Sequence, residues 1–509
     1  MLKIENTAAK SPRLAFQLFD ILDQHEIDYC HWKSNELLAE GLIGKTDLDL
    51  LVERGSFQSM VALLLNCGFK QATVRWGPGT PGLLHFYAFD NDAEDFIHVH
   101  LHSHLPTGAG AVETHLLPCE AMLLKGCSRI GQVRVPSREA EAAVGLLRKF
   151  IKNGSLLHML LRGRRHGRNE RDELLFSPVE EAAGAAYQAL GDCLRAIGRD
   201  LFMDCYRAFV EDAPAGRQWW LGLRVRRCLA GYRRQTAWGC LGAYAGLVAA
   251  KLRRVARGNI KNKVLDSGGA VIAFIGGDAT GKSTLVRESS QWLGSTFAVR
   301  TLHVGKPPCT CLTWPLFLLL PAARRLVPGQ RHAAQQALGV RPHNAKRQES
   351  PPPPRSWLYA IRAVALAWDR SCLLRKAQRA AAAGEIVICD RYPSDLSGAT
   401  DGPRLQVRAG QHSWRGRLFN WLARCEQRIY ERNPSPDLAL RLQVSIETAK
   451  RRNRERTKSD RHSDEDLECR HQPCRAWRKT GTKVVHDIDT EQSLADTTLS
   501  VKQAIWESL

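Results

Sequence analysis

The sequence predicts an α/β protein in three parts. We expect a small mixed α/β domain over residues 1–135, a basic and mainly helical region over 136–267, and a doubly wound parallel sheet over 268–509. A chain of 509 residues is too long for one hydrophobic core. In the last part, short apolar runs alternate with helix-compatible segments, which is typical of parallel sheets. In the first part strands and helices mix, and the arginine-rich middle has mostly helical periodicity.

The first part begins with an amphipathic segment, in which a serine and a proline serve as helix cap and first helical residue. Short apolar or alternating runs then predict strands. The expected elements are a helix from Ser11 to about His25, strands Ile27–His31 and Asp47–Val52, a helix from Ser56, and strands Leu84–Phe89 and Phe96–Leu101.

The middle part opens with Val135-Pro136-Ser137, where the serine is expected to cap a long helix. Its apolar run Ala237–Ala250 is too short to cross a bilayer. Basic residues follow the run, so it is either an amphipathic helix on a membrane surface or a packed core helix with a solvated end. The core helix is the more common of these two structures. The basic residues are Lys251, Arg253, Arg254 and Arg257.

Charge is spread unevenly along the chain, whose net charge is +21. Ten basic and sixteen acidic residues give residues 1–130 a net charge of −6, whereas residues 131–267 carry +12 and residues 268–509 carry +15. The two basic parts suit phosphorylated substrates or anionic lipid. Because no DNA- or RNA-binding motif accompanies the charge, we do not expect nucleic acid as a partner.

The cysteines and the N-terminal sequence bear on the compartment. The chain has 15 cysteines but no C-x-x-C pair, which argues against a zinc ribbon and fits a reducing environment. No secretion signal pattern begins the sequence. We therefore expect a cytoplasmic protein. Peripheral contact with the inner face of the membrane and a homodimer are left open.

A phosphate-binding pattern follows the apolar run Ala270–Ile275. Its spacing is G-x-x-x-x-G-K-[ST], between a predicted strand and a helix-compatible segment. The glycines let backbone N–H groups turn toward a phosphate chain, and the pattern predicts a nucleoside triphosphate ligand. The residues expected to hold it are Gly276, Gly277, Asp278, Ala279, Thr280, Gly281, Lys282, Ser283 and Thr284.

Charged residues follow later strands of the same part. A buried strand from Glu385 ends in Asp390-Arg391-Tyr392, where a carboxylate can serve Mg²⁺ and an arginine can contact phosphate. A further strand is expected over Leu438–Val444. The following segment, Ile446–Arg461, crowds its cations, which is unfavourable unless an anion is bound. These cations are Lys450, Arg451, Arg452, Arg454, Arg456, Lys458 and Arg461.

Together these motifs resemble the thymidylate kinase family over most of 268–509. Trp368-Asp369-Arg370 is similar to the family's segment for the acceptor phosphate, Asp278 to the residue that approaches the acceptor sugar, and Asp487–Asp489 with Ser493 to its last strand and turn. The resemblance implies ATP and Mg²⁺ as cofactors. It also implies that Lys282 holds the donor and that Ser283 and Asp390 serve Mg²⁺. Charge would be stabilised by Arg391, Arg370 and lid residues such as Arg456.

The acceptor half departs from that family. Ile275 takes the place of an acidic residue, His303-Val-Gly-Lys306-Pro307 replaces the base-contacting segment, and Pro393–Thr400 lacks the expected acceptor residues. We expect an ATP-dependent phosphotransferase of the nucleoside monophosphate kinase type, acting on a small phosphorylated acceptor. The alternative acceptor is a sugar or polyol phosphate in the synthesis of a cell-envelope polysaccharide.

Two carboxylates mark the N-terminal part. Asp47 and Asp49 lie at i and i+2 of a predicted strand, on one face, a spacing that suits divalent metal ions and a triphosphate. With His31-Trp32-Lys33-Ser34-Asn35 in the place of a Gly-Ser turn, residues 1–135 resemble the polymerase-β-type nucleotidyltransferase superfamily. The position of its third carboxylate is His100. An active transferase and a degenerate binding fold therefore both stay open.

The strand around His100 supplies another reading. Four alternating histidines share one face: His98, His100, His102 and His104. They either line an altered active site or bind a transition metal. At the level of the whole chain, two further alternatives remain: nucleotidyl transfer regulated by ATP at the phosphate-binding loop, and a non-enzymatic ATP switch on a membrane or polyanion.

Overall fold

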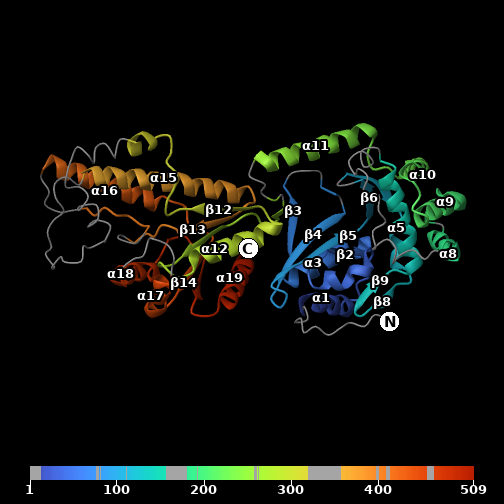
Figure 1. Ribbon diagram of the computed structural model, residues 1–509, viewed down its shortest axis with the longest axis horizontal. Coiled ribbons are helices and arrows are strands. Elements are labelled where there is room, and N and C mark those ends of the chain that lie inside the picture. The colour runs from blue at the N-terminus through green and yellow to red at the C-terminus, as the bar shows by residue number, and fades with distance from the viewer. Residues whose placement is uncertain are drawn as a thin grey trace. The chain divides into compact units, whose positions relative to one another are not determined.

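The computed structural model describes residues 13–75, 79–80, 82–109, 112–155, 180–191, 193–256, 261, 263–318, 357–396, 401–407, 413–455 and 464–509. The chain divides into two compact units, Met1–Asp266 and Ser267–Leu509. Each contains strands enclosed by helices (Figure 1), and each is described by itself.

A mixed six-stranded sheet forms the centre of the first unit. Its strand order is β1-β2-β5-β4-β3-β10; β2 and β5 are parallel, and the other neighbours are antiparallel. The strands are β1 (Tyr29–His31), β2 (Leu48–Val52), β5 (Asp95–His102), β4 (Leu83–Asp90), β3 (Lys70–Val74) and β10 (Lys263–Leu265). The four strands expected before residue 102 are present, whereas the sequence analysis did not identify β3 and β10.

Two helices cover this sheet with apolar side chains. Helix α1 (Arg13–Gln24) and helix α3 (Phe57–Asn66) bury Leu18 and Leu64 in one core with Leu50 and Val99 of the strands. Helix α3 begins near Ser56 as expected, after a short 3-10 turn. The remaining short elements are α2 (Leu38–Leu42), α4 (Glu120–Leu124), the pair β6 (Leu105–Ala109) and β7 (Val112–Leu117), and the pair β8 (Ser128–Ile130) and β9 (Val133–Val135).

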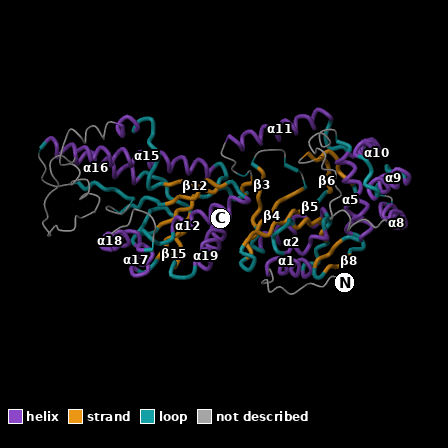
Figure 2. Tube along the Cα trace, in the orientation of Figure 1, coloured by secondary structure: helices purple, strands orange, loops and turns teal. Residues whose placement is uncertain are grey.

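The helical part shares a core with the sheet. Helix α5 (Arg138–Asn153) begins where predicted, and the Ser137 side chain accepts a hydrogen bond from the Ala140 N–H. It packs with α8 (Glu180–Leu190), α9 (Arg199–Val210) and α10 (Ala215–Cys228), as Figure 2 shows. Their apolar side chains, such as Phe150 and Phe202, join Trp32 of the sheet domain in one cluster. Helix α5 is thereby fixed beside the strand ends that carry the histidines.

Helix α11 (Ala237–Ala256) corrects one expectation. Its apolar composition favoured a packed core helix, but no described side chain of α11 is buried, and Trp238 is 81% exposed. The exposed large apolar residues are Trp238, Leu241, Val248, Leu252 and Val255. They recur at intervals of three, four and seven residues, so they form a stripe on one face of the helix. Among the described residues, no helix is both long and apolar enough to cross a membrane.

The second unit is an α/β domain around a five-stranded, fully parallel sheet. Its strand order is β12-β13-β11-β14-β15. The strands are β11 (Val271–Ile275), β12 (Val299–His303), β13 (Ile386–Asp390), β14 (Leu438–Gln443) and β15 (Val484–Asp489). The order departs from the chain sequence on both sides of β11, so the sheet is doubly wound, as the sequence predicted.

Helices cover both faces of this sheet (Figure 1). Helix α15 (Trp357–Ala382) buries Leu374 and Ala377 against Val271 and Ala273, while α12 (Lys282–Thr296) contacts α19 (Leu494–Ser508) and the strands. The other helices are α16 (Trp414–Glu431), α17 (Ile446–Arg454) and α18 (Asp464–Arg475). Since the strands are parallel, the segments that follow β11, β12 and β13 all emerge at the carboxyl edge of the sheet.

Candidate functional site

The loop between β11 and α12 has the backbone of a phosphate cradle. Ala279 and Gly281 adopt positive φ angles of 67° and 83°, and helix α12 begins at Lys282. The Thr280 hydroxyl donates to the Gly277 carbonyl at 3.0 Å, which closes the turn. A helix N-terminus and inward-turned N–H groups make such a loop an anion-binding site.

Lys282 is held inside this loop. Its side chain is 7% exposed, and its Nζ donates to the carbonyl oxygens of Gly276 at 2.7 Å and Gly277 at 3.0 Å. Burial lowers the pKa of the Lys282 amine, and the charge of Arg391 lowers it further, while Asp278 and Asp390 oppose the shift. A desolvated cation at this point gains strongly from an anionic ligand.

Asp390, the last residue of β13, and Arg391, the first residue after it, line a cavity with the same loop. Pairing of β12 with β13 sets His303 opposite Asp390, and His303 Nδ1 lies 2.8 Å from Asp390 Oδ2. The other carboxylate oxygen, Oδ1, is buried and has no hydrogen-bond partner among the described residues. Arg391 has a φ angle of 71°, an uncommon conformation for a non-glycine residue. Its guanidinium lies 3.2 Å from Asp278 Oδ1.

Arg370 is buried within the domain and is not exposed to a substrate. It is 1% exposed, and its guanidinium donates to the Tyr430 hydroxyl at 2.8 Å and to Asp401 Oδ1 at 2.9 Å. The backbone carbonyls of Val304, Gly305 and Asp401 also accept hydrogen bonds from it. Asp401 also lies 3.5 Å from Arg391 NH1. Arg370 is therefore connected to Arg391 through a shared carboxylate.

A cavity of about 180 Å³ joins most of the expected residues. The phosphate-binding loop from Gly277 to Thr284 lines it together with His303, Asp390 and Arg391. Gly276 and Arg370 do not line it, and Arg456 lies outside the described residues. The sequence thus predicted the side chains of the cavity, except for His303.

The basic segment after β14 has acidic partners within the chain. On α17, Lys450 pairs with Glu468 at 2.5 Å and Arg454 with Asp464 at 2.7 Å, both from α18. Arg452 donates to the Thr490 carbonyl at 2.7 Å. The crowded cations were expected to need a bound anion, but carboxylates of the chain balance two of them and a carbonyl oxygen accepts from the third.

His471 is a residue that the sequence analysis missed. It is buried on α18, and its Nε2 lies 2.8 Å from the carbonyl oxygen of Asp278. A Cβ atom at Gly277 would come within 2.6 Å of the His471 ring, so only glycine fits beneath it. No local sequence signal marks His471, because its role depends on α18 lying over the loop.

The N-terminal candidate residues gather on β2, β4 and β5. Strand pairing sets Asp49 opposite His100 and His100 opposite His85. Asp49 is 6% exposed, and its Oδ1 lies 2.9 Å from Lys33 Nζ, 3.1 Å from His100 Nδ1 and 3.3 Å from His102 Nε2. Burial raises the pKa of Asp49, but bonds from these histidines and the charge of Lys33 outweigh it and hold the pKa well below its usual range.

Asp47 is 48% exposed and pairs with His98, whose Nδ1 lies 2.5 Å from Asp47 Oδ1. Burial raises the pKa of Asp47, but the bond and charge of His98 prevail and bring it to about 2. Burial lowers the pKa of His98 to about 3 and that of His85 to about 2. Both imidazoles are therefore neutral at pH 7, beside two ionised carboxylates.

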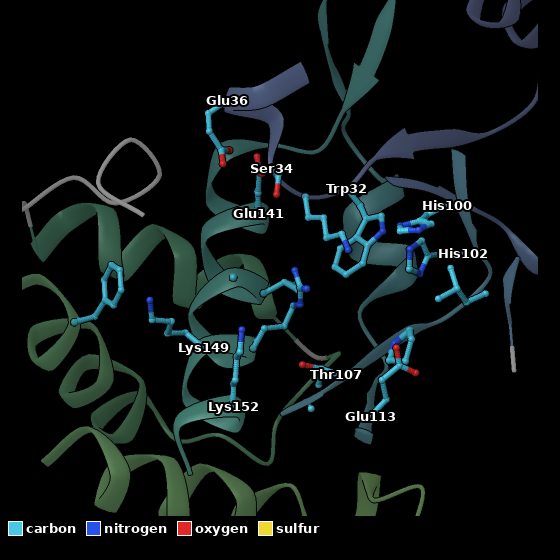
Figure 3. A pocket seen from close by; sticks show the side chains of 18 residues that line it. Trp32, Ser34, Glu36, His100, His102, Thr107, Glu113, Glu141, Lys149 and Lys152 are labelled. Carbon is cyan, nitrogen blue, oxygen red and sulfur yellow. The ribbon is translucent and has the colours of Figure 1, made fainter. Parts of the chain in front are cut away.

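A cavity of about 440 Å³ opens beside Asp49. Figure 3 shows His100 and His102 next to Trp32 on one side, and Lys149 and Lys152 on a helix on the other. Lys33 and Arg148 also line the cavity. The Arg148 guanidinium stacks 4.6 Å over the Trp32 ring, and its buried Nε has no hydrogen-bond partner among the described residues. Four cations thus line this cavity, together with the carboxylates of Glu36, Glu113 and Glu141. Ser34, which also lines it, has a φ angle of 59°.

Comparison with known proteins gives a limited match. No family model matches the chain. The chain is 38% identical over 84 residues to a protein named "Uncharacterized ATP-binding protein YghR" from Escherichia coli K12, and equally to the protein of that name from E. coli O6:H1 strain CFT073. The match covers 16% of this chain and 32% of the relative, so it spans about a third of that protein's length.

Proposed function

We propose that the second unit binds ATP with Mg²⁺ and transfers a phosphoryl group to a small phosphorylated acceptor. The observation that carries this proposal is the convergence of Lys282, Asp390 and Arg391 on one cavity at the carboxyl edge of a parallel sheet. The similarity to a protein named as ATP-binding supports ATP as the ligand. Phosphoryl transfer depends mainly on positioning and charge stabilisation, and this cavity contains the side chains for both.

Each residue has a distinct role in this proposal. Loop N–H groups and Lys282 bind the donor phosphates, and Lys282 exchanges its two carbonyl partners for phosphate oxygens. Arg391 leaves Asp278 to neutralise charge on the group in transfer, which such arginines accelerate by about 10³–10⁵. Asp278, released from that ion pair, can accept a hydrogen bond from the acceptor.

Magnesium fits the residues present. The Oδ1 atom of Asp390 is buried without a hydrogen-bond partner among the described residues, and a carboxylate oxygen is a preferred ligand of hard cations. The Ser283 hydroxyl lines the same cavity. Asp390 and Ser283 would hold the ion, which supplies charge neutralisation on the donor phosphates. Asp390 keeps its orientation through His303.

The acceptor is the less determined half of this proposal. The resemblance favours a nucleoside monophosphate such as thymidylate, whereas the altered segments after His303 and Asp390 favour a sugar or polyol phosphate. Buried Arg370 orients Arg391 through Asp401, so neither arginine selects the acceptor's non-phosphate part. Residues outside this network must therefore select the class of acceptor.

The test is a panel of acceptors with Mg²⁺-ATP, read as ADP formed and as new phosphorylated product. The proposal predicts turnover with one acceptor class, and turnover lost in Lys282→Ala. An equal rate in Arg287→Ala, an exposed position on α12, is the matched control. ATP consumption without any acceptor, or unchanged turnover in Lys282→Ala, would reject the kinase.

Nucleotidyl transfer in the first unit is a second candidate. The observation that favours it is the cavity in which Lys33 and Arg148 lie near Asp49, since a triphosphate needs cations beside a metal-binding carboxylate. It predicts pyrophosphate release that disappears in Asp49→Asn. Release that persists in that variant would dismiss this candidate.

A further inference from the structure

The first unit sets histidine nitrogens around its paired carboxylates. His100 pairs opposite Asp49, and Asp49 Oδ1 already lies within 3.3 Å of nitrogen atoms of Lys33, His100 and His102. Such a set does not suit Mg²⁺, which prefers oxygen ligands in octahedral geometry. Imidazole nitrogens suit zinc and its neighbours in the transition series.

We propose that His85, His98 and His100 bind a zinc ion. They come from neighbouring antiparallel strands, His85 from β4 and the other two from β5. One ring nitrogen of each lies within 4.8 Å of the others. His85 Nδ1 and His98 Nε2 are 3.3 Å apart, the separation expected between two nitrogens that each lie about 2.0–2.1 Å from a tetrahedral zinc ion.

The two carboxylates fix which nitrogen of each histidine carries the proton. His98 Nδ1 donates to Asp47 and His100 Nδ1 donates to Asp49. Both rings therefore leave Nε2 with its lone pair, which is the form that binds a metal. Zinc-bound histidines usually donate their other N–H to a carboxylate in this way. Asp47 and Asp49 are thus positioning residues for the histidines rather than metal ligands.

Three imidazole ligands leave the fourth position of a tetrahedral zinc ion open to water or a ligand. The site also has a path for entry, because His100 lines the cavity of about 440 Å³. The inference does not depend on phosphoryl transfer in the second unit. It competes with nucleotidyl transfer in the first unit, because it makes Asp49 a partner of His100 rather than a metal ligand, and its test needs no turnover.

The test measures zinc in the full-length protein after removal of metal with a chelator and dialysis against buffered zinc. We expect one zinc ion per chain, and a tetrahedral absorption spectrum when cobalt replaces it. His85→Ala and His98→Ala should each lose the ion. His104→Ala, which removes a histidine after the end of the same strand, and His102→Ala should keep it. A thermal unfolding transition for each variant shows that it is folded.

Asp47→Asn separates positioning from ligation. Removal of a carboxylate behind a zinc-bound histidine weakens affinity by about 10–100-fold, so this variant should still bind zinc, but more weakly. A tenfold excess of Mg²⁺ should not displace the ion. No zinc on the parent protein, equal loss in His104→Ala, or full retention in His85→Ala would overturn the assignment. Loss in His102→Ala without loss in His85→Ala would also overturn it, in favour of the Asp49–His100–His102 group.

Discussion

The two candidate sites balance charge in opposite ways. In the second unit, buried Lys282 and partly exposed Arg391 are the dominant cations, and the chain's own carbonyl oxygens and Asp278 contact them. In the first unit, the carboxylates Asp47 and Asp49 lie at the centre, and histidines contact them. The cations of the second unit suit a ligand with negative charge, whereas the carboxylate and histidine face of the first unit suits a metal cation. The two proposals therefore rest on opposite kinds of side chain.

The largest expected effect comes from the removal of one cation from the site of the second unit. Arg391→Ala removes the guanidinium that faces Asp278 across the cavity, and we expect a loss of about 10³–10⁵ in kcat with little change in ATP affinity. The measurement is steady-state ADP formation beside ATP binding. Arg287→Ala should leave both unchanged. A loss of less than tenfold in Arg391→Ala would mean that this arginine does not act on the transferred group.

A second variant tests whether Arg370 supports Arg391 from within the core. Arg370→Met leaves Asp401 buried with one cation fewer, and breaking a buried pair costs about 3–5 kcal/mol. We expect that loss in the free energy of unfolding of the second unit, measured in urea. Arg375→Met, exposed on the same helix, should change it by less than about 0.5 kcal/mol. Equal stability of the two variants would contradict the role given to Arg370.

A third prediction concerns His115, a buried histidine that the fold of the first unit keeps neutral. Burial, together with the charges of nearby Arg226 and Arg233, lowers the pKa of His115 to about 4. The unfolded chain, with a histidine pKa of about 6.5, then binds a proton that the folded chain does not. Stability should therefore fall as pH drops from about 6.5 to 4, by up to about 1.4 kcal/mol per pH unit.

His115→Phe should flatten this pH dependence, read from urea unfolding at pH 7.5, 5.5 and 4.5. His25→Phe, at an exposed position, should keep the slope of the parent protein. An unchanged slope in His115→Phe would show that this histidine is not held neutral.

The smallest expected effect concerns His471, which lies over the phosphate-binding loop. Gly277→Ala places a methyl group against the His471 ring, and such overpacking costs about 1–3 kcal/mol. We expect weaker ATP binding and a lower melting temperature, both measured by ligand-dependent thermal unfolding. The double variant Gly277→Ala/His471→Ala should recover most of the loss. Failure to recover would place the cause in the loop backbone instead.

The sequence predicted the features that are determined by residues close together in the chain. The strand–loop–helix around Lys282, the strand that ends in Asp390 and the cap at Ser137 each depend on residues close together in the chain. The sequence also placed His100 on a strand next to that of Asp49, and the pairing of β2 with β5 sets these two residues opposite each other. That His100 takes the place of a third carboxylate stays a prediction.

The sequence could not predict contacts that tertiary packing determines. His471 reaches the phosphate-binding loop from about 190 positions away, and Asp401 joins two arginines from separate elements. Strand β4, which brings His85 opposite His100, was expected, but its register with β5 was not readable. The expectation of a packed core helix at α11 was wrong for a different reason. An apolar composition does not specify which face of a helix other elements cover.

The most direct test of the account is phosphoryl transfer from Mg²⁺-ATP to the acceptor panel, comparing the parent protein with Lys282→Ala by ³¹P NMR. The account predicts ADP and one new phosphorylated product from the parent protein, and neither from the variant, with both proteins folded. Product formed equally by both proteins, or ADP formed with free phosphate as its partner for every acceptor, would contradict it.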